Sequence, residues 1–156
     1  MTDVSVLSPE TLLAHWLGHR RLTRRMIDAF PDDELFRFSV GGMRPFGEFV
    51  IEFLSMQEPI VHGVAAGEWR REPFPRPATK AELIALWDQA TAAIQAAFPT
   101  IPPHRFSEVD KAFGMWEGTG IASILYAIDN EIHHRGQAYV YLRALGIAPP
   151  AFPDRS

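Results

Sequence analysis

The segment between Gly118 and Gly146 constrains the fold most, because it predicts one long helix with two different faces. One face carries an ordinary apolar stripe that neighbouring elements must cover. The other face has small and polar side chains where a packed helix normally shows leucine, so an imidazole lies among buried elements and requires a role. The apolar stripe comprises Ile121, Leu125, Ile128, Ile132 and Tyr139, and the small and polar face comprises Ser123, Ala127, Asn130, His134, Ala138 and Tyr141.

Three further segments have the periodicity and the end signals of amphipathic helices. Ser8 is a cap with proline at the first helical position, and Thr79 begins a capping box with Glu82. The carboxylate of Glu52 falls on the inward stripe of the second segment, where it needs a proton or a cation. The three segments are expected at about residues 9–30, 45–67 and 79–98.

Four helical segments, no segment with the alternation of a strand and no internal repeat predict an all-α fold, a four-helix bundle. The segment from His104 to Trp116 is expected to be a loop or a short extra turn. The linkers after the first and third helices are longer than tight hairpins need, which permits a crossover in an up-down-down-up order. The length of 156 residues and an apolar fraction of 47% predict a single domain covering 1–156.

Composition excludes several function classes. The chain has no cysteine, which excludes disulfides, a thiolate metal site and a cysteine nucleophile. The net charge of −4 is spread without long runs of one sign, so we expect no nucleic-acid face, and we interpret the arginines at 20, 21, 24 and 25 as a solvated helix face. The start of the chain, Met1 to Ser8, lacks a signal sequence, and no apolar run reaches a membrane span of about 18 residues. We therefore expect a soluble cytoplasmic protein.

The stretch Asn130–Pro150 contains Asn-Glu-Ile-His-His-Arg-Gly-Gln and then Tyr-Leu-Arg-Ala-Leu-Gly-Ile-Ala-Pro-Pro, which resembles the C-terminal signature of the DinB/YfiT-like metalloenzymes. The second helix, entered through Arg44-Pro45-Phe46-Gly47-Glu48 and left through Gly67-Glu68-Trp69, is similar to the family's second helix. The resemblance thus covers nearly the whole chain. It implies a four-helix bundle, often dimeric, with a divalent metal held by one side chain of the second helix and two of the fourth at i and i+4.

In this sequence the implied metal ligands are Glu52, Asn130 and His134. Residues four apart lie one above the other on a helix, with Cβ atoms about 6 Å apart, so both can reach one ion. The family usually has histidine at all three positions, and here only one imidazole is kept. The resulting ligand set has harder donor atoms and would bind a metal more weakly, and it favours Zn, Ni, Mn or Mg over Cu.

Each candidate also has an ordinary structural interpretation. His134 could be a hydrogen-bonded core histidine, Glu52 could pair with Arg24 or Arg135, and Asn130 could hold a water. His133 points elsewhere and is expected at the rim or surface. His15 and His19 form a rival i, i+4 pair. Two imidazoles would bind a metal more tightly than Asn130 and His134, although the family has no ligands at these positions. His62, off the Glu52 face, is a weaker candidate.

Two functional hypotheses follow. The first is a metal-dependent hydrolase or a transferase that uses a low-molecular-weight thiol, as the resemblance implies. The second is a helical bundle that has lost its metal and acts as a binding or stress-response protein without catalysis. No catalytic residue is predicted. We also expect a two-fold homodimer, because the stripe from Ile121 to Ile132 together with Trp16 and Leu17 exceeds what one interior can cover.

Overall fold

The structure, a computed structural model, describes residues 6–156, so the first five residues of the N-terminal segment inspected for a signal sequence lie outside the described residues. The chain is mostly helical, with one small antiparallel sheet. The predicted helices are confirmed to within about two residues at each end. The elements are α1 (Pro9–Ala29), α2 (Asp32–Leu35), α3 (Phe46–Ala66), α4 (Lys80–Ala97), the 3₁₀ turns η1 (Phe98–Thr100) and η2 (Pro103–Phe106), β1 (Val109–Ala112), β2 (Trp116–Thr119) and α5 (Gly120–Ala144).

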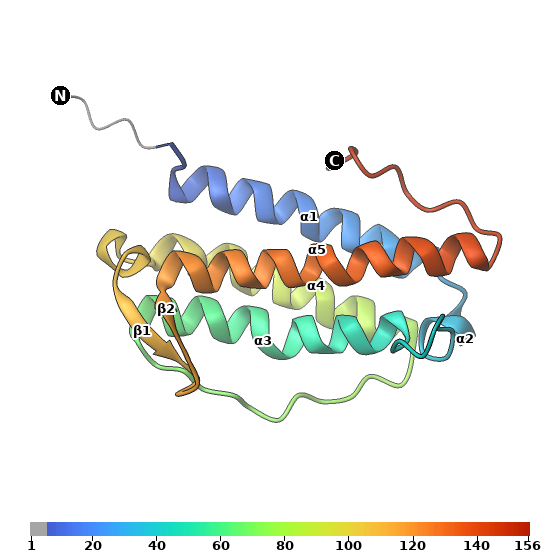
Figure 1. Cartoon of the computed structure of the whole chain (residues 1–156), viewed down its shortest axis with the longest axis horizontal. Helices are drawn as coiled ribbons and strands as arrows, with labels where there is room; N and C mark the ends of the chain where they lie inside the picture. Colours follow the sequence, from blue (N-terminus) through green and yellow to red (C-terminus); the bar gives the residue numbers. More distant parts are fainter. Residues whose placement is uncertain (1–5) are drawn as a thin grey trace.

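The four long helices lie side by side, and the consecutive helices α1 and α3, like α4 and α5, are not main neighbours, whereas α3 and α4 are. α1 packs against α4 and α5, and α3 packs against the same two helices. Figure 1 shows α1 and α5 running in one direction and α3 and α4 in the other. The crossover is therefore the long loop between α3 and α4, which returns along the length of the molecule. The linkers after the first and third long helices, where we expected room for a crossover, connect antiparallel helices instead.

The helix ends follow the signals in the sequence. The Ser8 hydroxyl accepts from the Thr11 amide at 3.2 Å, and the Thr79 hydroxyl accepts from the Glu82 amide at 3.2 Å. The Glu82 carboxylate in turn accepts from the Ala78 amide at 2.7 Å, one residue before the cap. Gly67 ends α3 in the left-handed region at φ 73°, which glycine adopts without strain.

The apolar interior has two clusters along the helices. One is centred on Phe46, Phe53 and Trp87, and the other on Trp16, Ile60 and Ile124. Trp16 is fully buried, so it does not belong to the surplus apolar surface that we expected on the first helix. Leu125 is 39% exposed, which shows that the predicted apolar stripe of α5 is turned partly outward.

The segment from His104 to Trp116, predicted as a loop or a short extra turn, contains most of the 3₁₀ turn η2, but also β1 and the start of β2, which we did not predict. The two strands pair antiparallel from Val109 opposite Thr119 to Ala112 opposite Trp116. The turn between them places Phe113 and Gly114 at positive φ. Both strands are four residues long and mostly exposed, so they lack the alternation of apolar residues that identifies a half-buried strand.

Two further points complete the fold. The short helix α2 lies in the linker between α1 and α3. Within the described residues, no helix combines the length and the apolar character needed to cross a membrane.

Candidate functional site

The three predicted ligand positions lie together at the contact between α3 and α5. The Asn130 amide nitrogen donates to Glu52 Oε1 at 3.2 Å, and His134 Nε2 lies 3.7 Å from the same oxygen. Glu52 comes from the first half of α3, while the other two side chains lie one turn apart on α5. The i, i+4 spacing therefore places both α5 side chains beside one carboxylate oxygen.

The imidazole of His134 is held in a fixed orientation. Its ring stacks on Phe49 with centroids 4.1 Å apart and an angle of 12° between the planes. Its Nδ1 lies 2.9 Å from Gln137 Oε1, an acceptor, so the neutral ring carries its proton on Nδ1. Burial lowers the pKa of His134 despite the opposing effects of Gln137 and Glu52. Nε2 therefore presents a lone pair toward the Glu52 carboxylate.

Glu52 has a cationic partner that differs from both arginines that we considered. Arg44, in the loop before α3, places its guanidinium 2.7 Å from Glu52 Oε2. Burial raises the pKa of Glu52, but the hydrogen bonds from Arg44 and Asn130 outweigh it and lower the pKa below its ordinary value. The carboxylate is thus ionised at neutral pH, with one oxygen bound to arginine.

The two arginines that we had considered for Glu52 have other partners. Arg24 pairs with Asp88 at 2.8 Å, and Arg135 contacts His19 and Thr23. The interpretation that Glu52 pairs with an arginine is confirmed, but the partner is Arg44 and not Arg24 or Arg135.

The donor set fits a resident divalent ion only in part. Glu52 Oε1 and His134 Nε2 are separated by a distance that two ligands of one ion can adopt. Asn130 turns its donor nitrogen to the carboxylate, and the Arg44 charge opposes a second cation. Among residues 6–156, no group of three His, Cys, Asp or Glu side chains could hold a metal. The ligand set Glu52, Asn130 and His134 stays a prediction.

A pocket of about 390 Å³ opens beside this cluster, between α3, α5 and the hairpin of β1 and β2. Glu52 belongs to both the pocket and the cluster. The wall is largely apolar and aromatic, with charged side chains from Arg71 and Glu117. A concave apolar site with a few convergent polar groups is the usual form of a small-molecule site. The other lining residues are Met56, Ile60, Ala112, Phe113, Trp116, Gly118, Ala122, Ser123 and Tyr126.

The rival pair on α1 also lies close together, but its hydrogen bonds oppose metal binding. His19 Nε2 and His15 Nε2 are 3.1 Å apart. Arg135 donates to His19 Nδ1 at 2.8 Å, so the neutral His19 ring carries its proton on Nε2, the atom that faces His15. Burial, followed by the charges of Arg135, Arg155 and His15, lowers the pKa of His19 to about 3. His19 is therefore a neutral core histidine that donates to its neighbour.

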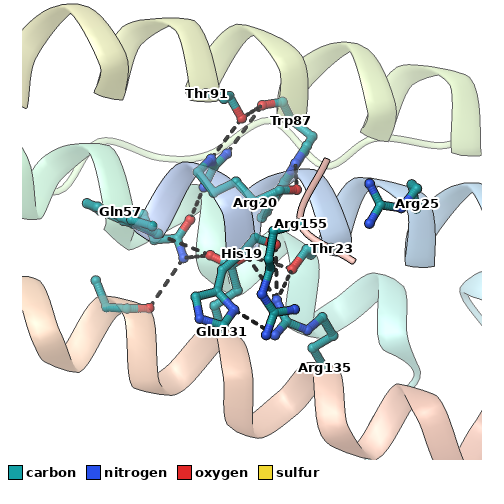
Figure 2. Close-up of polar contacts among 12 residues, drawn as sticks. His19, Arg20, Thr23, Arg25, Gln57, Trp87, Thr91, Glu131, Arg135 and Arg155 are labelled. Carbon is teal, nitrogen blue, oxygen red and sulfur yellow. Dashed lines mark hydrogen bonds and ion pairs between the residues drawn. The ribbon is translucent and has the colours of Figure 1, made fainter. Parts of the chain in front are cut away.

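Next to His19 lies a buried polar network that the sequence reading missed (Figure 2). Its centre is the fully buried carboxylate of Glu131, which accepts from Thr23 at 2.6 Å and from Gln57 at 2.9 Å. Arg20, which we expected on a solvated face, is also fully buried and binds Thr91, Gln57 and the Trp87 carbonyl. Among the described residues, no buried side-chain nitrogen or oxygen lacks a hydrogen-bond partner.

The two histidines outside the cluster, His133 and His62, lie on the surface. His133 and His62 are exposed, as expected for side chains outside the site. His62 lies 3.5 Å from Glu58 at a second pocket of about 510 Å³, formed by the outer face of α3 and the loop at 68–75.

Comparison with known proteins supports the resemblance found in the sequence. The model of the DinB family matches residues 76–155. The uncharacterised protein YjoA of Bacillus subtilis is 24% identical over 140 residues, which is 86% of this chain and 89% of YjoA. The crystal structure of YjoA, a DinB-like protein, superposes with a TM-score of 0.74 and 22% identity, covering 92% of this chain and 96% of YjoA. A DinB-like protein from Bacillus cereus gives a TM-score of 0.66 and 19% identity, covering 91% and 95%.

Proposed function

Because the chain belongs to the DinB family, we propose that it is an up-down-down-up four-helix bundle of that family that binds a small organic molecule without a resident metal ion. The observation that carries this proposal is the ion pair between Arg44 and Glu52 at 2.7 Å. At the position where the resemblance implies a metal ligand, the carboxylate already has a cation supplied by the chain. The protein then corresponds to the metal-depleted binding or stress-response bundle of the second hypothesis.

The pocket supports a binding role. Its volume of about 390 Å³ falls in the range of small-molecule sites, and its aromatic wall offers apolar contact area. Trp116 and Tyr126 line it and are 56% and 60% exposed, so both have surface that a ligand would cover. Glu52 at the same pocket provides a charged group that orients a bound molecule.

A metal-dependent enzyme, either a hydrolase or a transferase using a low-molecular-weight thiol, is the second candidate. It is favoured by the approach of His134 Nε2 to Glu52 Oε1 at 3.7 Å. If a divalent ion (Zn, Ni or Mn) binds there, Glu52 and His134 supply the donor atoms, and the ion would polarise a substrate or bind a thiolate. Binding would weaken as the pH falls through the imidazole range near 6.5, since both ligands must be deprotonated.

Metal content separates the two candidates. Protein purified without a His-tag or a chelating column is expected to contain far less than one equivalent of any transition metal by elemental analysis. A stoichiometric ion whose binding is lost in Glu52→Gln and His134→Ala would support the enzyme and contradict the metal-free proposal.

A designed variant tests the position of the site. Asn130→His restores the pair of imidazoles that the family usually has, so it is expected to bind Zn²⁺ or Ni²⁺ more tightly in titration calorimetry. His15→Ala is the control and should leave this gain intact. If Asn130→His has no effect while His15→Ala or His19→Ala removes an ion, the site lies on α1.

The homodimer is a separate proposal. Ile121 and Ile132 are partly exposed and Leu125 is 39% exposed, which gives α5 an apolar strip for a second copy. Light scattering at tens of micromolar should give the mass of a dimer, and a monomer mass would contradict this proposal.

A further inference from the structure

The Glu52 cluster contains two hydrogen-bond acceptors that face each other, of which Glu52 Oε1 also accepts from Asn130 at 3.2 Å and can accept a further hydrogen bond. Glu52 Oε1 and His134 Nε2 lie 3.7 Å apart, which is too long for a hydrogen bond between them. The proton of the His134 ring is used at Nδ1 by Gln137, so it does not lie between the two acceptors. Two such acceptors suit a group with several N–H donors that lies to one side of both, within hydrogen-bond distance of each.

The chemistry of the pocket restricts the remainder of the ligand that carries these N–H donors. Most of the wall is apolar and includes the rings of Phe113, Trp116 and Tyr126 together with Met56 and Ile60 of α3. A ring or a short hydrocarbon chain would fill this space, while the charged end would reach Glu52. Aromatic walls also tolerate a cation, because the faces of the rings are electron-rich.

We infer that the ligand of this pocket is a primary amine with an aromatic or aliphatic body, whose ammonium group binds Glu52 Oε1 and His134 Nε2. This inference rests on the proposed function and names its ligand class. An ammonium carries three donors and no acceptor, so it satisfies both lone pairs without a metal ion. Arg44 keeps Glu52 Oε2, and the ammonium takes the other oxygen of the same carboxylate.

Arg44 and the ammonium group would share the Glu52 carboxylate. Removing Arg44 and removing the charge of Glu52 should therefore change amine affinity in opposite directions. Arg44→Met removes the competing guanidinium and is expected to raise amine affinity by about threefold to tenfold. Glu52→Gln replaces a charged acceptor with a neutral amide and is expected to lower amine affinity by about tenfold or more. Glu58→Gln is the matched control on α3, because Glu58 lines the second pocket, and it should leave amine binding unchanged.

Titration calorimetry with three probes that share a phenylethyl group tests the inference: 2-phenylethylamine, 2-phenylethanol and 3-phenylpropionate. The amine should bind at least about tenfold more tightly than the alcohol and the carboxylate, and Glu52→Gln should abolish this preference. Equal binding of the amine and the alcohol, a preference for the carboxylate, or a preference for the amine that survives Glu52→Gln would overturn the inference. Failure of all three probes to bind would overturn it as well.

Failure of the proposed function is distinguishable from failure of the inference. Ala122→Trp fills the pocket and should abolish binding of every probe that the wild type binds. If the alcohol binds as well as the amine and Ala122→Trp removes both, the pocket stands and the ammonium inference is wrong. If Ala122→Trp leaves all binding unchanged, the molecules bind elsewhere and both proposals are wrong.

Discussion

Two carboxylates on the contact between α3 and α5 lie in opposite environments. Glu131 is fully buried, with donors from Trp16, Thr23 and Gln57 on its two oxygens. The Glu52 side chain is 30% exposed and borders a pocket, and its Oε1 faces the acceptor His134 Nε2 in addition to the Asn130 donor. A carboxylate enclosed by donors in the interior indicates a structural role, whereas a partly exposed carboxylate that faces another acceptor beside a pocket indicates a site for a ligand.

The largest expected effect tests whether the inner carboxylate is structural. Glu131→Ala leaves Trp16, Thr23 and Gln57 without their buried acceptor and removes the carboxylate 3.9 Å from Arg135. We therefore expect a loss of about 3–5 kcal/mol in the free energy of unfolding. Glu52→Ala removes a half-exposed ion pair and should cost less than about 1 kcal/mol. Urea denaturation followed by circular dichroism measures both, and equal losses would remove the distinction between the two sites.

A smaller effect is expected from the hydroxyl group that donates to the inner carboxylate, Glu131. Thr23 donates to Glu131 at 2.6 Å and accepts from Arg135 at 3.1 Å. Thr23→Val keeps the shape and removes both bonds, so it should cost about 1–3 kcal/mol in the same denaturation experiment. Ser123→Ala, in the pocket wall, is the control and should change stability by less than about 0.5 kcal/mol. If Thr23→Val left the free energy of unfolding unchanged, the network would contribute little to stability.

The two histidines make the free energy of unfolding depend on pH, with a small change for each pH unit. The pKa of His19 is about 3 in the folded protein, below its ordinary value of 6.5, so between these values the unfolded state binds the proton more readily. Stability should therefore fall as the pH drops from about 6.5 toward 3, by at most about 1.4 kcal/mol per pH unit for this group. The pKa of His134 is also lowered, which gives a contribution of the same sign.

Substitution separates the two histidines. His19→Gln should flatten the acid side of the stability profile more than His134→Gln, because the shift of His19 is the larger one. Thermal denaturation between pH 4 and pH 7 measures the slopes. Parallel profiles for the wild type and His19→Gln would contradict a buried neutral His19.

The sequence predicted the parts of the structure that depend on local signals. Ser8 and Thr79 start helices as caps, and the i, i+4 spacing of Asn130 and His134 placed both beside Glu52. Arg44 was missed because its reach to Glu52 depends on the path of a loop, which no periodicity encodes. Sequence pattern also treats a charged residue as exposed, so Arg20 and Glu131 were missed, although both are buried beside partners from other helices.

The way in which the helices alternate has a consequence for folding. The chain consists of two antiparallel helix pairs, α1 with α3 and α4 with α5, separated by the crossover loop. The main helix contacts all join one pair to the other, since α1 and α3 each pack against α4 and α5. Neither half can therefore build a hydrophobic core alone, and the chain must form contacts between residues distant in sequence before burial stabilises it. Folding should thus be slower than in a bundle of sequential hairpins and cooperative over the whole chain, and two fragments divided within the loop should acquire structure only when mixed.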